Sequence, residues 1–101
     1  MSAPQVRSDY DQLQTIQNTF NSQADAISKM NNNIKSHMQT LEGGDWIGEG
    51  ARKFYSEMND QVMPSLQRLQ RALTEAARVT QQISALMQQA EQEASNVFKI
   101  Q

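Results

Sequence analysis

The residues best able to do chemistry in this sequence are few and scattered. His37 is the only histidine among 101 residues, and there is no cysteine. A catalytic or metal-binding histidine needs further histidines, cysteines or carboxylates at a suitable spacing. No such grouping is evident, so we expect His37 to lie on an ordinary helix surface. The sequence predicts no catalytic residue, no cofactor and no metal, and therefore no enzyme.

Three arginines offer a second kind of chemistry, the binding of phosphate groups. Arg68, Arg71 and Arg78 recur along one side of a predicted helix, but Glu75 falls between them at the spacing of helical ion pairs. The net charge of −2 gives no general attraction to nucleic acid or to an anionic membrane surface. We expect a solvated face of mixed charge and no nucleic-acid partner.

Composition restricts the class of fold. Only 38% of the chain is apolar, and Gln, Asn, Ser and Ala dominate the remainder, which favours helices over strands. The length predicts one domain over residues 1–101. No segment approaches the roughly 20 apolar residues that span a bilayer, and the start "MSAPQVRSDYDQ" lacks the apolar core of a secretory signal. We expect no membrane span, and any export would use another signal.

Apolar residues then recur at steps of three and four along two segments, which predicts two long helices. The first runs from about 8 to 42, where Ser8 and Asp11 resemble a capping box and Gly43 is a natural stop. The second runs from about 46 to 97, with Asp45 able to cap its start. Pro64 lies inside the second pattern and predicts a bend near 60–64 rather than an end.

Two amphipathic helices joined by a short link must fold back antiparallel, so the predicted class is an all-α helix-turn-helix hairpin. At 1.5 Å per residue, Ser8 should face roughly Thr80, which leaves a C-terminal tail, 82–101, overhanging helix 1. Apolar residues also spill beside each stripe and need cover, which favours pairing of two hairpins into a four-helix bundle. The predicted hairpin or dimer interface comprises Leu13, Ile16, Phe20, Ile27, Met30, Ile34, Phe54, Met58, Leu66, Leu69 and Leu73.

The link between the helices, "GGDWIGEG", holds all four glycines and the only tryptophan of the chain. Glycines allow a tight reversal, and we expect Trp46 to cover the open end of the hairpin as a packed corner residue. Trp46, Ile47 and Gly48 form a Trp-x-Gly tripeptide placed centrally between two helical patterns and followed by Phe54. In these features the sequence resembles the WXG family of roughly hundred-residue, early-secreted-antigen (ESAT)-like proteins.

The resemblance implies a helical hairpin that pairs into a homodimer or heterodimer and is a substrate of bacterial type VII secretion. It also implies that the tripeptide of one subunit and the tail of its partner form a recognition surface, here Trp46, Ile47 and Gly48 with Leu86, Val97 and Phe98. Family members often carry Tyr-x-x-x-Asp/Glu after the second helix as part of the export signal. This chain does not, because its tyrosines are Tyr10 and Tyr55, and residue 59 is Asn.

The resemblance therefore favours a small secreted protein or secretion adaptor that is exported from a cytoplasmic pool. Its implied partners are the type VII secretion ATPase and either a second copy of the chain or a similar small hairpin protein. Mixed charges on both helices favour the homodimer, whereas the missing motif favours a partner that carries the signal. The alternative is an intracellular helical interaction module, with or without weak DNA binding through the arginines.

Overall fold

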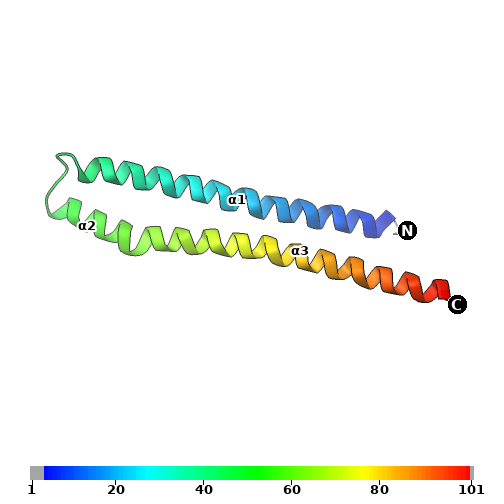
Figure 1. Cartoon of the computed structure of the whole chain (residues 1–101). Helices are drawn as coiled ribbons and strands as arrows, with labels where there is room; N and C mark the ends of the chain where they lie inside the picture. The colour runs from blue at the N-terminus through cyan, green and yellow to red at the C-terminus, as the bar shows by residue number, and fades with distance from the viewer. Residues whose placement is uncertain (1–3, 101) are drawn as a thin grey trace. The chain divides into compact units, whose positions relative to one another are not determined.

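The computed structural model describes residues 4–100, and side chains from Arg7 to Val97. The described chain is helical on both sides of one turn: α1 is Pro4–Glu42, α2 is Glu49–Glu57, a π-helical turn is Met58–Val62, and α3 is Met63–Ile100 (Figure 1). No strand occurs among these residues. The predicted all-α helix-turn-helix hairpin is confirmed. None of the described helices is long and apolar enough to cross a membrane.

The helix starts differ from the sequence predictions in two places. α1 begins at Pro4, ahead of the expected start near Ser8. Proline suits the first turn of a helix because its φ is already helical and its missing N–H would have no partner there. α2 begins at Glu49 and is preceded by Gly48, with no side-chain hydrogen bond at the cap, so Asp45 does not take the capping role.

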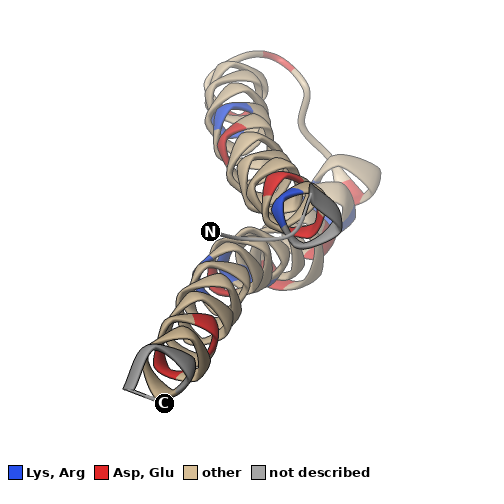
Figure 2. Cartoon of the chain, turned by 90° about the vertical axis from the view of Figure 1, so that its right-hand side faces the viewer, with Lys and Arg blue, Asp and Glu red and all other residues tan. Residues whose placement is uncertain are grey.

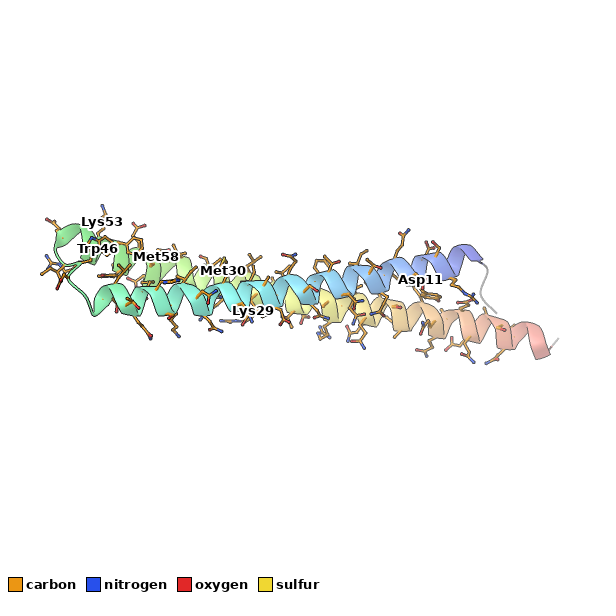
Figure 3. All side chains as sticks on the ribbon, turned by 90° about the horizontal axis from the view of Figure 1, so that it is seen from above. Asp11, Lys29, Met30, Trp46, Lys53 and Met58 are labelled. Carbon is orange, nitrogen blue, oxygen red and sulfur yellow. The ribbon has the colours of Figure 1, made fainter. Side chains whose placement is uncertain are left out.

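The chain divides into two compact units. Unit 1 joins the part of α1 up to Asn21 to the part of α3 from Thr74, and unit 2 comprises residues 22–73. In each unit, segments of the two long helices lie side by side (Figures 1 and 3). Unit 2 also contains the turn and is therefore a hairpin in itself.

The core of both units is a narrow seam of small side chains. The buried apolar residues are Ala24, Met38, Ala51 and Ala77, and the structure buries no large side chain completely within its described part. Along α1 the shielded positions 24, 31 and 38 are seven residues apart, which is the period of a two-helix seam. Larger apolar residues at the edges of the seam are only half-buried.

A π-helical turn shifts the phase of this seam by one residue. Inward positions before it, Tyr55 and Met58, follow steps of four and three, but the next inward residue, Met63, comes five residues later. The N–H of Met63 donates to the carbonyl of Met58, five residues back. Pro64 follows directly, and its ring would crowd the carbonyl of residue 60 in a regular α-helix, so the wider turn relieves that clash. The helix continues past Pro64, as predicted.

In unit 1 the two helices stay paired further than the sequence arithmetic implied. The hydroxyl of Tyr10 donates to Oε2 of Glu91 at 3.0 Å. Partial burial raises the pKa of Tyr10 above its ordinary value, and the hydrogen bond to the carboxylate raises it further. Tyr10, near the start of α1, is thus paired with Glu91 rather than with a residue near Thr80. The overhang beyond α1 is therefore shorter than the predicted tail 82–101.

One buried residue of unit 2 is polar and lacks a partner. Asn31 is only 7% exposed, and neither its amide nitrogen nor its amide oxygen makes a hydrogen bond. It occupies a seam position between Ala24 and Met38. A buried amide without partners costs about 1–3 kcal/mol of desolvation, so this position lowers the stability of the hairpin.

Replacing Asn31 with Ala is accordingly expected to raise the free energy of unfolding by about 1–2 kcal/mol. The substitution removes the desolvation penalty of the unpaired amide, and alanine has the higher helix propensity. Asn32→Ala is the matched control, because Asn32 is exposed and gains only the propensity of about 0.5 kcal/mol. Denaturant unfolding followed by circular dichroism measures both. A destabilised Asn31→Ala protein would show that the amide finds a partner in solution.

Candidate functional site

The turn of unit 2 is set by a glycine in an unusual conformation. α1 ends at Glu42, and the N–H of Gly43 closes its last turn on the carbonyl of Gln39 at 3.0 Å. Gly48 then adopts φ 116° and ψ −177°, a backbone conformation that L side chains rarely reach. A Cβ at Gly48 would meet nothing within 4 Å, so glycine is needed for its backbone angle rather than for space.

Three aromatic rings, which come from residues on both sides of Gly48 in the sequence, pack against one another. The Trp46 ring meets Phe54 at 5.2 Å and Tyr55 at 5.4 Å between centroids, and Phe54 and Tyr55 lie 6.0 Å apart, all edge to face. Such pairs are attractive beyond the area they bury, because ring edges are positive and ring faces negative. We call Trp46, Ile47, Gly48, Phe54 and Tyr55 the aromatic tip (Figure 3 labels Trp46).

A hydrogen bond fixes the turn to the helix that follows it. The hydroxyl of Tyr55 on α2 donates to the backbone carbonyl of Trp46 at 3.1 Å. Partial burial raises the pKa of Tyr55, and the negative charge of Glu42 raises it further, so this hydroxyl keeps its proton at neutral pH. This hydrogen bond therefore ties the backbone of Trp46 in the turn to α2.

The tip presents apolar surface to solvent instead of burying it. Trp46 is 42% exposed, and Ile47 is 81% exposed. Trp46 is therefore only in part the packed corner residue that the sequence predicts. One part of its ring packs on Phe54 and Tyr55, and the rest is exposed to solvent. Exposed apolar side chains held on a fixed backbone are typical of a surface that binds a protein partner.

The predicted interface residues divide into two groups. Half-buried between the helices of their own unit are Leu13, Phe20, Ile27, Ile34, Met58, Leu66 and Leu73. Exposed are Ile16, Met30, Phe54 and Leu69, of which Phe54 contacts Trp46. The first group is placed where a hairpin contact belongs, and the second is free to meet another chain.

Of the residues predicted for tail recognition, Leu86 and Val97 are exposed on α3. The side chain of Phe98 lies outside the described residues. α3 remains helical to Ile100.

The remaining candidates from the sequence do not converge on a reactive centre. His37 is exposed, and the described residues hold no group of His, Asp and Glu side chains that would bind a metal ion. Arg78 pairs with Glu75 through two hydrogen bonds, of which Nε to Oε2 measures 3.0 Å. This pair raises the pKa of Arg78 and lowers that of Glu75. Basic and acidic residues occur on the same helices (Figure 2), as expected for a face of mixed charge.

Unit 2 also has a hollow of about 320 Å³ beside the π-helical turn, with Met38, Met63 and Pro64 among its lining residues. Its other lining residues are polar or charged: Lys35, Gln39, Glu42, Asn59 and Gln67. Its two ionisable lining residues, Lys35 and Glu42, form no ion pair with each other.

Sequence reasoning missed Tyr55 as a site residue and Asn31 as a buried polar residue. The signal for Tyr55 was present, because Phe54 and Tyr55 are adjacent aromatic residues shortly after the Trp-x-Gly tripeptide. Nothing in the sequence distinguished Asn31 from its neighbours Asn32 and Asn33.

Comparison with known proteins gives one match. The model of the family described as WXG100, proteins of 100 residues with WXG, matches residues 5–92. Neither the curated proteins nor the solved structures contain a significant match. The matched range includes most of both long helices and the whole aromatic tip, so the chain belongs to the WXG100 family.

Proposed function

We propose that this protein is a non-enzymatic secreted protein, or a secretion adaptor, of a bacterial type VII secretion system, and that it acts as a dimer of helical hairpins. The WXG100 family is linked in general to type VII secretion substrates, which are exported and pair as hairpin dimers. The family is not enzymatic in general. Its partners here are the secretion ATPase and a second hairpin, which is another copy of the chain or a similar small protein.

The observation that carries the proposal is the exposure of the aromatic tip. A tripeptide that served only to close the hairpin would bury its large side chains. Here Trp46 is braced by two rings and one hydrogen bond, while Ile47 points its side chain into solvent. That arrangement supports recognition by another protein, with the rigid backbone lowering the entropy lost on binding.

Export without the Tyr-x-x-x-Asp/Glu motif requires another source of the signal. The exposed Leu86 and Val97 on α3 support a role for this chain's own tail together with the tip. A partner hairpin that carries the motif is the other route. In both cases the protein forms a cytoplasmic pool before it is secreted.

The central experiment is a secretion assay in the native host, with and without a functional type VII ATPase. The protein is expected in the culture supernatant only when the ATPase is active. Retention in the cells of both strains would contradict the proposal and leave an intracellular interaction module.

Variants at the tip separate recognition from packing. Trp46→Ala is expected to lower the free energy of unfolding by about 2 kcal/mol, less than for a fully buried ring, and to reduce export strongly. Ile47→Ala is the sharper variant: it should melt within about 0.5 kcal/mol of wild type, because the side chain is largely in solvent, yet still reduce export. Normal secretion of Ile47→Ala would exclude the tip as a recognition surface.

Shortening the chain tests the tail. Removal of residues 93–101 keeps Glu91 and its hydrogen bond with Tyr10, so circular dichroism is expected to show a folded helical protein. Export is expected to be lost, and Phe98→Ala alone should reduce it. Asn96→Ala, which changes a neighbouring exposed polar residue, serves as the control with normal export. Full secretion of the shortened chain would assign recognition to other residues.

A further inference from the structure

The hollow beside the π-helical turn of unit 2 has the size of a small ligand site. Its volume of about 320 Å³ lies at the lower end of the range for ligand pockets. Asn59 of the π-helical turn and Met63 directly after it both line the hollow. π-Helical turns inside α-helices occur frequently at functional sites.

The two ends of the hollow carry different chemistry. α1 runs toward the turn of the hairpin, and the helix after the turn runs away from it. Glu42 and Asn59 are therefore the lining residues nearest the turn, and Lys35 and Gln67 are those furthest from it. Apolar residues line the middle, and these are Met38, Met63 and Pro64.

The end near the turn has hydrogen-bond acceptors that lack their usual partners. The N–H of Met63, which would donate to the Asn59 carbonyl in an α-helix, donates to Met58 instead. The next residue, Pro64, has no N–H, so the Asn59 carbonyl has neither its α-helical nor its π-helical donor. The carboxylate of Glu42 makes no ion pair in the described part of the chain. A carbonyl and a carboxylate together favour an ammonium group.

The far end offers a cation at a defined distance. Lys35 makes no ion pair with any described residue, so its ammonium group is available to a carboxylate. Lys35 and Glu42 are seven residues apart on α1, which is about 10 Å along the helix axis. An extended dipeptide is about 7 Å long, and hydrogen bonds of about 2.8 Å at its two ends bring the total to about 12 Å. The flexible side chains of Lys35 and Glu42 accommodate that span.

The hollow opens on the polar flank of α1. Relative to the inward Met38, Lys35 and Glu42 fall on one flank of the helix, and the exposed Met30 and Leu41 fall on the other. A protein that covered the exposed apolar residues of α1 would therefore leave the hollow open. The hollow also shares no residue with the aromatic tip.

We propose that this hollow binds a zwitterion of dipeptide size with an apolar side chain. The ammonium group of the ligand binds Glu42 and the Asn59 carbonyl, its carboxylate binds Lys35, and its side chain packs on Met38 and Met63. A fatty acid would leave the acceptors at Glu42 without a donor, and a simple amine would leave Lys35 without a partner. Methionine side chains adapt to different shapes, so the site accepts a range of aliphatic side chains. This inference goes beyond the proposed function and does not rest on it.

Titration of the full chain with leucyl-leucine, followed by NMR of the methionine methyl groups, tests the proposal. Saturable shifts are expected at Met38 and Met63, whereas Met87 in unit 1 is expected to stay unchanged. N-acetyl-leucyl-leucine lacks the ammonium group, and leucyl-leucine amide lacks the carboxylate. Each is expected to bind about tenfold more weakly than leucyl-leucine, because one charged hydrogen bond is lost.

Variants assign each charge of the ligand to one end of the hollow. Glu42 and Lys35 are exposed, so circular dichroism is expected to show that Glu42→Gln and Lys35→Gln fold as wild type. Glu42→Gln should bind leucyl-leucine and its acetylated form almost equally, and Lys35→Gln should bind leucyl-leucine and its amide almost equally. Lys29→Gln removes an exposed lysine of α1 outside the hollow and should bind as wild type.

Two results would overturn the inference: methionine shifts that do not saturate at millimolar peptide, or equal binding of all three peptides by the wild-type protein. Either result leaves the ATPase-dependent secretion assay unaffected, so failure of this site is distinguishable from failure of the proposed function.

Discussion

The structure depends on the limited cover that two paired helices give each other. Each helix can shield a single line of side chains, and in the described residues the buried members of that line are Ala24, Asn31, Met38, Ala51, Ala77 and Thr80. Most of the larger apolar residues remain half-buried or exposed as a result. The exposed apolar side chains, those of the aromatic tip among them, are the ones that this narrow seam leaves outside.

Hydrophobic periodicity predicted both helices and their pairing. It did not decide which of two neighbouring residues on a helix faces the seam. In four places the inferred apolar stripe included a residue that is exposed while its polar neighbour is turned inward; the pairs are Ile16 and Gln17, Met30 and Asn31, Leu69 and Gln70, and Ile83 and Ser84. Hydropathy favours the apolar member of each pair. The packing instead follows a seven-residue spacing in which alanines such as Ala24 and Ala77 are buried, and the sequence does not rank these two above other alanines.

The π-helical turn explains why the inward positions of the second helix were harder to predict from the sequence than those of the first. A bend near Pro64 was expected from the sequence, but the five-residue step from Met58 to Met63 was not. That step turns Val62 outward and Met63 inward. It changes the phase of every inward position that follows on α3, and one residue is too small a shift for an apolar pattern to reveal. The same limit applies at the tip, where the sequence contained the rings but not the hydrogen bond from Tyr55 to Trp46.

The exposed apolar residues of the two units differ in their chemical surroundings. The aromatic tip belongs to unit 2, and its sequence neighbourhood from Glu42 to Asp60 is rich in charges of both signs. Ring edges and nearby charges give a partner directional features to recognise. In unit 1 the exposed Ile16, Val79, Ile83 and Leu86 lie in stretches of sequence without charged residues and offer aliphatic contact without such features. The proposed recognition by a secretion ATPase needs discrimination among many proteins, and the rings and charges at the tip provide directional features for it that the aliphatic residues of unit 1 lack.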